Sequence, residues 1–201
     1  LVIHGGVLAL ILLLAGIFFV LFYTYPLKYV GLGEIAVIIV WGPLMIGGGY
    51  YVLTGQWDWN VTIASLPYAL GPTLVIFGKH IDKLMEDRAR RIFTLPVILG
   101  EKAARMITLA MMAVQYLAVV YLIIAGFFSP LILVVFLSLR NLPRVWRMFT
   151  KPKPDQAPEN YPPDTWPLWF VASAFYHNRS FGMVFLLGLA LELGYRLIAG
   201  S

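Results

Sequence analysis

Long apolar stretches alternate with short polar ones along the whole chain. Apolar runs cover residues 1–22, 35–53, 61–77, 103–124, 131–139 with their flanks, and 182–197. About 20 apolar residues are needed to cross the roughly 30 Å hydrocarbon core of a bilayer. The pattern therefore predicts an all-α polytopic membrane protein with about six transmembrane helices, of which the run at 131–139 is the shortest.

Prolines and glycines interrupt the second and third predicted helices. The second contains the sequence WGPLMIGGGYY, and the third contains Pro67 and Pro72. Proline removes a helical hydrogen bond, so both helices should be bent. The glycine run should allow close helix packing. Broken helices at membrane depth usually line protein or a cavity, which indicates an internal cavity here.

Two segments near the C-terminal end depart from the simple helical pattern. The sequence TKPKPDQAPENYPPDTW, residues 150–166, is too rich in proline for a helix and predicts an irregular segment. The aromatic sequence WPLWFVASAFYHNRSFG, residues 166–182, predicts a helix that lies in the membrane interface before the last span.

The composition supports a membrane protein and excludes cysteine chemistry. Hydrophobic residues make up 60% of the 201 residues, and mean hydropathy is +0.81. The chain has no cysteine, which excludes disulfides, thiolate metal sites, c-type haem attachment and a cysteine nucleophile. The first residue is Leu1, already inside an apolar run. We therefore interpret residues 1–201 as a single membrane domain that forms the C-terminal part of a longer protein.

Positive charge is distributed unevenly between the predicted loops. Alternating helices would place loops 23–33, 78–102 and 140–179 on one side of the membrane, and loops 55–60 and 126–130 on the other. The second group contains no lysine or arginine. Cytoplasmic loops carry the excess of these residues, so the first group is predicted to be cytoplasmic. The net charge of +5 is then a topology signal, and no nucleic-acid partner is predicted.

The densest charge lies in the sequence GKHIDKLMEDRARRIFTLPVILGE, residues 78–101. We expect a helix over 79–91, with Asp82 and Glu86 on one face. One interpretation is a solvated helix stabilised by Lys83–Asp87 and Glu86–Arg90 pairs. The other is a site for a metal ion and a diphosphate. Mg²⁺ prefers carboxylate and phosphate oxygens, and neighbouring cations would take the remaining phosphate charge.

Part of this segment resembles a known family. DKLMEDRARRIFTLPVILGEKAAR resembles the second aspartate-rich motif of the UbiA superfamily of intramembrane prenyltransferases. FYTYPLKYVGLGE resembles a loop of the same family, and VWGPLMIGGGYYVLTG resembles a span of its naphthoate-type members. The resemblance implies nine helices around a central cavity, of which this chain would hold the last six. The family's first aspartate-rich motif is absent from residues 1–201 and should precede them.

The resemblance also implies roles for individual residues. In the family, Mg²⁺ between the two motifs holds an isoprenyl diphosphate, which ionises to an allylic carbocation that alkylates an aromatic acceptor. The implied metal-binding and catalytic acids are Asp82, Glu86 and Asp87. The family usually spaces these acids by four, which makes Glu86 the acid that follows Asp82 in the motif. Counting back from TLPV instead aligns Asp87 with the last acid of the motif, in which case the helix bulges by one residue. Naphthoate-type members usually carry asparagine where this chain has Lys79.

Several neighbouring residues are candidates for substrate binding. Lys28 would bind diphosphate or mark the cytoplasmic boundary, and Tyr23 and Tyr25 would stabilise the carbocation or anchor the loop at the interface. His80 borders the site. It either supports the residues that bind the substrate, acts as a base on the acceptor, or is a solvated surface histidine. The cations expected to bind phosphate oxygens are Lys79, Lys83, Arg88 and Arg90.

The function predicted is transfer of a polyprenyl group from polyprenyl diphosphate to an aromatic acceptor within the bilayer, with Mg²⁺ as cofactor, in menaquinone or another quinone pathway. A chlorophyllide or haem acceptor is an alternative. A second alternative is a non-catalytic membrane subunit or pigment-binding scaffold, and a third alternative is a transporter. Whether the protein has a partner in a membrane complex is left open.

His4 and His177 could each ligate a chlorin or haem or simply form hydrogen bonds. Glu192 and Arg196 should pair within the last helix.

Overall fold

The structure, a computed structural model, describes the backbone of residues 2–200 and the side chains of residues 6–200. The described residues form helices joined by turns and irregular segments, with no strand among them. The elements, in chain order, are α1 (Val2–Phe22), η1 (Leu27–Val30), α2 (Gly33–Ile39), η2 (Val40–Gly47), α3 (Gly48–Thr54), α4 (Trp59–Ala64), α5 (Leu66–Asp82), α6 (Leu84–Ala89), α7 (Leu95–Leu99), α8 (Glu101–Ile124), η3 (Pro130–Asn141), α9 (Leu142–Thr150), η4 (Pro163–Thr165) and α10 (Phe170–Ala199).

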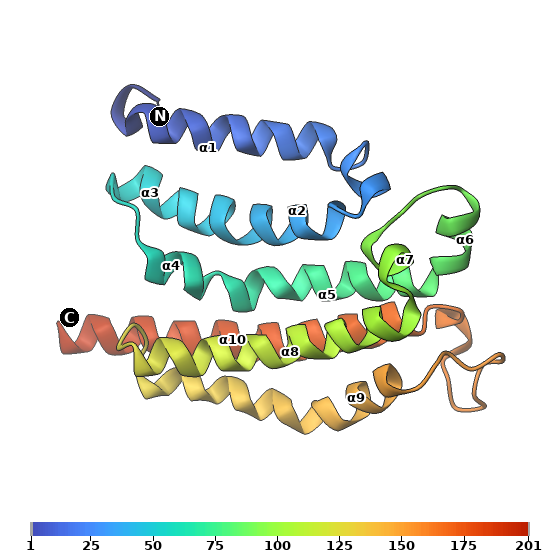
Figure 1. The fold of residues 1–201 in the computed structure, drawn as a ribbon. Coiled ribbons are helices and arrows are strands. Elements are labelled where there is room, and N and C mark those ends of the chain that lie inside the picture. Colours follow the sequence, from blue (N-terminus) through green and yellow to red (C-terminus); the bar gives the residue numbers. More distant parts are fainter. Residues whose placement is uncertain (1, 201) are drawn as a thin grey trace.

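The long helices run side by side in alternating directions, with α1 at one edge and η3–α9 at the other (Figure 1). Four segments are long and apolar enough to cross a bilayer: Gly33–Thr54, Trp59–Asp82, Glu101–Ile124 and Phe170–Ala199. Gly6–Phe22 is a shorter apolar helix. The expected all-α membrane fold is confirmed. The predicted run at 131–139 forms the 3₁₀ helix η3, which α9 continues.

The two groups of loops lie at opposite ends of the bundle, as predicted. The turn after α1, the short helices α6 and α7, and the proline-rich segment before α10 lie at one end (Figure 1). The connections α3–α4 and α8–η3 lie at the other end (Figure 1). Every loop expected to be cytoplasmic is therefore on the same side, and their placement in the cytoplasm stays a prediction.

The irregularities predicted in the second and third spans are present. Val40–Gly47, which contains Pro43, is a π-helix, consistent with the missing proline donor. The third span is interrupted at Ser65, between α4 and α5, while Pro72 lies within an unbroken α5. Gly42 makes this packing close, because a Cβ there would lie 3.0 Å from Ser65 Oγ.

One predicted element is wrong. No separate interfacial helix forms over residues 166–182, because α10 runs without a break from Phe170 to Ala199. The prediction treated polar side chains at 177–180 as a helix end, but His177 and Asn178 face α8 and α5 rather than interrupting the helix. The proline-rich segment is irregular as predicted, apart from the short turn η4.

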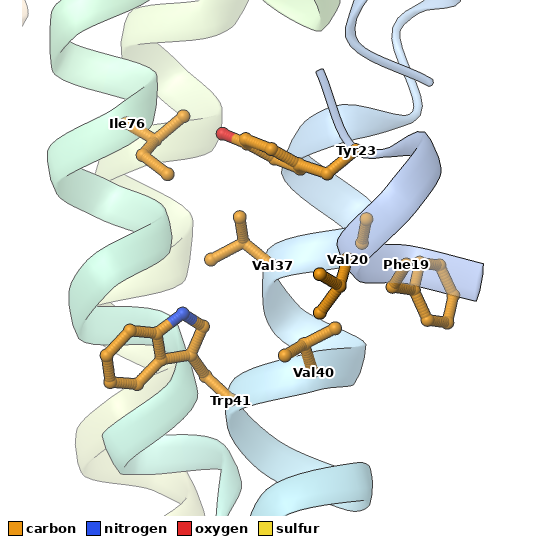
Figure 2. A pocket seen from close by; sticks show the side chains of 8 residues that line it. Phe19, Val20, Tyr23, Val37, Val40, Trp41 and Ile76 are labelled. Carbon is orange, nitrogen blue, oxygen red and sulfur yellow. The ribbon is translucent and has the colours of Figure 1, made fainter. Parts of the chain in front are cut away.

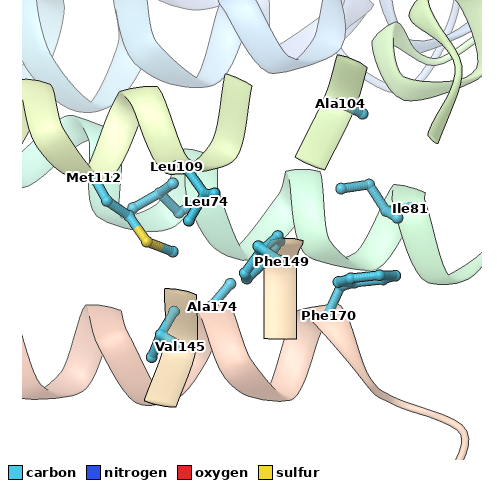
Figure 3. Packing of buried hydrophobic residues seen from close by; sticks show 9 residues of the cluster. All are labelled: Leu74, Ile81, Ala104, Leu109, Met112, Val145, Phe149, Phe170 and Ala174. Atoms are coloured by element: carbon cyan, nitrogen blue, oxygen red, sulfur yellow. The ribbon is translucent and has the colours of Figure 1, made fainter. Parts of the chain in front are cut away.

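The main core lies where α5, α8, α9 and α10 meet. Buried residues from all four helices interlock there, including Leu74, Met112, Phe149 and Phe170 (Figure 3). At the start of α10 the contact is between backbones, because a Cβ on Gly78 would lie 2.7 Å from the Phe170 carbonyl oxygen. The last turn of α5 is thereby fixed against the first turn of α10.

Candidate active site

Two loops that carry the recognisable sequence motifs meet at one end of the bundle. The Phe93 backbone N–H donates to the Tyr29 carbonyl over 3.3 Å. Gly31 has φ 75°, and a Cβ there would lie 3.4 Å from the Phe93 carbonyl oxygen. Glycine therefore allows the turn before α2 to lie directly on the chain between α6 and α7.

Glu34 and His80 form a fully buried polar contact beneath these loops. Glu34 is 0% exposed, and its Oε1 lies 2.6 Å from His80 Nδ1 and accepts from the Leu95 backbone N–H over 3.2 Å. Glu34 Oε2 is buried without a partner. His80 is therefore not the solvated surface histidine that was one alternative. From the sequence, Glu34 is only an acid suited to the first turn of the second predicted helix, and its buried contact with His80 was not anticipated.

An apolar cavity of about 310 Å³ lies between α1, α2–η2 and α5. The Tyr23 ring extends across it toward Ile76 of α5, and Val37 and Trp41 line it from α2–η2 (Figure 2). Burial, and to a lesser extent the charge of Glu34, raise the pKa of Tyr23. The Tyr23 hydroxyl is thus protonated at neutral pH and presents one polar group to an apolar space. The volume is at the lower end of the range typical for ligand pockets.

The other two candidates in the first loop lie differently. Tyr25 is 69% exposed, and its ring packs edge-on against Tyr29 with centroids 5.4 Å apart, so it does not line the cavity. This position matches the interfacial-anchor alternative. Lys28 is partly buried in η1 and forms no ion pair in the described part of the chain.

Asp82 is engaged at the start of α10. Its Oδ1 accepts from the Phe170 N–H over 3.1 Å and its Oδ2 from the Val171 N–H over 2.9 Å. Lys153 Nζ lies 3.9 Å from Oδ1, and the Asp82 side chain is 3% exposed. The first N–H groups of a helix have no intrahelical acceptor. Asp82, at the end of α5, supplies acceptors for two of these N–H groups of α10, and its negative charge interacts favourably with the positive end of the helix dipole.

The helix expected over residues 79–91 is interrupted. α5 ends at Asp82 and α6 begins at Leu84, with Lys83 at φ −103° and ψ 13° between them. Asp82 and Glu86 therefore do not share one face of a continuous helix. Among the described ion pairs there is neither Lys83–Asp87 nor Glu86–Arg90. The break follows from Asp82 and Gly78 both being held against α10.

The other two acids of the segment have contrasting surroundings. Glu86 is exposed, whereas Asp87 is buried and its Oδ2 has no hydrogen-bond partner. In the part of the chain that the structure describes, no three acidic or histidine side chains are close enough to share a metal ion. By donor chemistry, Asp87 and Glu86 have carboxylate oxygens free for Mg²⁺, and Asp82 has both of its oxygens already accepting hydrogen bonds.

The candidate phosphate-binding cations are available to solvent. All four side chains are exposed: Lys79, Lys83, Arg88 and Arg90. Among them, only the Arg88 side chain has a described hydrogen bond, in which Nη2 donates to the Val97 carbonyl over a long distance of 3.4 Å. They lie on the last turn of α5, in α6 and in the residues next to these two helices.

Comparison with known proteins identifies the family of this chain. The sequence model of the UbiA prenyltransferase family matches residues 1–178. The chain belongs to this family. The resemblance noted from the sequence is thereby confirmed, and the two UbiA-type motifs are the loops that meet above Glu34 and His80.

Two curated relatives of this UbiA-family chain are named as an octaprenyltransferase and a phytyltransferase. It is 29% identical to the 1,4-dihydroxy-2-naphthoate octaprenyltransferase of Bacillus subtilis over 85% of this chain and 51% of that protein. It is 28% identical to the 2-carboxy-1,4-naphthoquinone phytyltransferase of Synechocystis over 55% of this chain and 38% of that protein. The chain spans about half the length of the Bacillus relative and less of the other. No solved structure matches significantly.

Two polar contacts elsewhere in the bundle account for the remaining candidates. His177 Nε2 lies 3.0 Å from Gln115 Oε1, so this histidine forms a hydrogen bond inside the protein, as the simpler alternative held. Glu192 pairs with Arg196 over 2.9 Å, as predicted, and also accepts from the Ser129 N–H over 3.0 Å. The His4 side chain lies outside the described residues.

Proposed function

We propose that the protein containing this chain is an intramembrane prenyltransferase. It transfers a polyprenyl group from polyprenyl diphosphate to a naphthoate-derived aromatic acceptor in quinone biosynthesis. The observation that carries the proposal is the meeting of the two UbiA-type loops directly beside an apolar cavity. The family match and the names of the relatives support the same reaction class.

The cavity and the charged segment suit the two parts of such a substrate. The cavity is apolar and accommodates part of an isoprenoid tail, while the exposed cations near α6 suit the diphosphate. In the reaction the bond between the allylic carbon and the diphosphate oxygen breaks, and the electron pair leaves with the diphosphate. A carbon of the acceptor ring then attacks the allylic cation, and the ring becomes aromatic again by losing the proton, or the carboxylate as CO₂, from the attacked carbon. The Tyr23 ring lines the cavity, and its face would stabilise positive charge there.

Magnesium would be held by Asp87 and Glu86 together with acids from the first motif of the family. When bound, it would neutralise charge on the diphosphate. Asp82 fits a positioning role better, since its carboxylate fixes the first turn of α10. The exposed Lys79, Lys83, Arg88 and Arg90 would bind phosphate oxygens around the metal. Lys28 would add a further cation from the first loop.

The test is an assay of the full-length protein in membranes. Polyprenyl diphosphate and 1,4-dihydroxy-2-naphthoate are supplied with Mg²⁺ or with a chelator, and the prenylated product is quantified by chromatography. We expect product only with Mg²⁺ present. Correctly inserted protein that makes no product from naphthoate, chlorophyllide or haem acceptors would instead support a non-catalytic scaffold.

A further inference from the structure

A second cavity lies at the opposite edge of the bundle from α1, where α9 leads into the proline-rich segment (Figure 1). It has a volume of about 500 Å³ and lies between α9, that segment and the start of α10. The polar and aromatic residues that line it are Arg144, Arg147, Lys151, Asn160, Tyr161 and Trp169. We call this cavity the α9 cradle. Nothing in the proposed reaction uses it.

Two of the three cations of the cradle share one face of α9, and the third follows the helix. Arg144 and Arg147 are three residues apart, which places them on the same side of α9. Lys151 is the first residue after α9 and has an extended backbone, with φ −113° and ψ 152°. Val145 and Phe149 anchor the opposite side of α9 in the core, so packing fixes the face from which Arg144 and Arg147 extend.

These cations have no anionic partner within the protein. None of the three forms an ion pair in the described residues. Arg147 Nε donates only to the carbonyl one turn earlier, and Arg144 lies 5.6 Å from the centre of the Tyr176 ring. The acids of the neighbouring segment point to solvent instead; they are Asp155, Glu159 and Asp164. The three cations of the cradle thus have no ion-pair partner among the described residues.

Two buried donors at the cradle also lack partners. Trp169 Nε1 is buried without a hydrogen bond, and Trp169 lines the cradle. Ser173 is 5% exposed, and its Oγ is likewise unpaired. Ser173 lines an adjoining cavity of about 170 Å³ that shares Arg144 and Tyr161 with the cradle. Buried polar groups are nearly always hydrogen-bonded, so unpaired donors beside unpaired cations indicate an anionic oxygen ligand.

An apolar hollow continues from the cradle along the outside of α9. Leu139, Leu142, Pro143 and Trp146 line it, and Arg147 lines both spaces. Tryptophan is enriched where protein meets the headgroup region of a bilayer. A ligand that occupies both spaces has a phosphate-like head and a hydrocarbon tail.

We propose that the α9 cradle binds an anionic glycerophospholipid. Its phosphate contacts Arg144, Arg147 and Lys151, the Trp169 and Ser173 donors complete the headgroup contacts, and one acyl chain lies along the hollow beside Trp146. This site is independent of the proposed prenyl transfer. It differs from general attraction of basic loops to an anionic membrane, because the ligand is held by specific donors.

The test uses the full-length protein, purified in detergent with phosphatidylglycerol or phosphatidylcholine and examined by native mass spectrometry for retained lipid. The cradle variant is Arg144→Gln with Lys151→Gln. The matched control is Arg179→Gln with Lys102→Gln, which also removes one arginine and one lysine, both exposed and outside the cradle. A cation near an anionic lipid surface contributes about fivefold in affinity. We therefore expect the cradle variant to bind phosphatidylglycerol about 25-fold more weakly, and the control to match the wild type.

Ser173→Ala provides a milder test, because it removes one buried hydroxyl without changing charge; we expect severalfold weaker retention of phosphatidylglycerol. Equal retention of the two lipids by the wild type would overturn the proposal, as would equal losses in the cradle and control variants. Displacement of the lipid by millimolar inorganic diphosphate would identify a soluble anion as the ligand and also overturn it.

Discussion

The contrast between Asp82 and Asp87 gives the sharpest prediction. Asp82→Asn keeps the shape of the side chain but replaces a carboxylate that accepts two backbone N–H groups from α10. The amide has one oxygen acceptor, so one of the two N–H groups would face an NH₂ group. Asp87→Asn replaces a carboxylate whose Oδ2 has no partner in the protein. The first change should therefore affect stability, and the second should affect catalysis.

The expected magnitudes follow from the contacts. A hydrogen bond to a charged group contributes about 1.5–3 kcal/mol, and Asp82→Asn also removes the charge that favours the N-terminal end of α10. We expect a loss of about 2–3 kcal/mol in the free energy of unfolding, which corresponds to a fall of several degrees in Tm. If Asp87 binds Mg²⁺, losing one ligand charge should cost about 3 kcal/mol in the transition state, or roughly 100-fold in rate.

The assay combines two readouts on the full-length protein. Thermal stability is measured in detergent by the fraction that stays monodisperse after heating, and prenyl transfer is measured at a temperature below both midpoints. Asp82→Asn should lower Tm and keep much of the activity, whereas Asp87→Asn should keep Tm and lose activity. An unchanged Tm in Asp82→Asn with a hundredfold loss of rate would show that Asp82 is a metal ligand and that our capping argument is wrong.

Three further predictions concern packing and topology. Gly78→Ala should destabilise the protein by about 1–3 kcal/mol, because the new Cβ would lie 2.7 Å from the backbone of α10. The control, Gly182→Ala, should be neutral or stabilising, because no atom lies within 4 Å of its new Cβ. Similar melting temperatures for the two variants would contradict this prediction. Glu34→Gln should lower the free energy of unfolding by about 1–2 kcal/mol, because it weakens two hydrogen bonds, and the loss should appear as a lower Tm. An unchanged Tm would show that these hydrogen bonds do not stabilise the fold. Cysteines introduced at Gln56 and Glu159 should be labelled from opposite sides of the membrane, and labelling from one side would refute the topology.

Much of the fold could be predicted from hydrophobic length alone. Apolar runs predicted most of the long helical segments, because the bilayer imposes a length that is visible in the sequence. The position of Pro43 likewise indicated the irregular second span, since a missing donor has a local effect. The last helix was divided wrongly because polar side chains such as Asn178 can be buried between helices, and periodicity does not show what lies opposite them.

The candidate site was predictable only in part. The motifs located the two loops that meet, and the resemblance supplied a reason for the acids. The interruption at Lys83 was not visible, because it depends on Asp82 reaching a helix that begins 88 positions later in the chain. Glu34 was missed for a similar reason: its partners are His80 and Leu95, and neither is a neighbour in sequence. Contacts between distant segments decide which acids remain free for chemistry.

The attachment of α10 to the end of α5 has a consequence for judging activity from sequence. If the carboxylate at position 82 is needed to begin α10, a relative that has lost catalysis would still be selected to keep it, along with the glycine one turn earlier. An intact acid at this position would then report a folded bundle rather than a working enzyme. If Asp87 holds Mg²⁺ as proposed, position 87 would be the better place to look when deciding whether a UbiA-type chain is active.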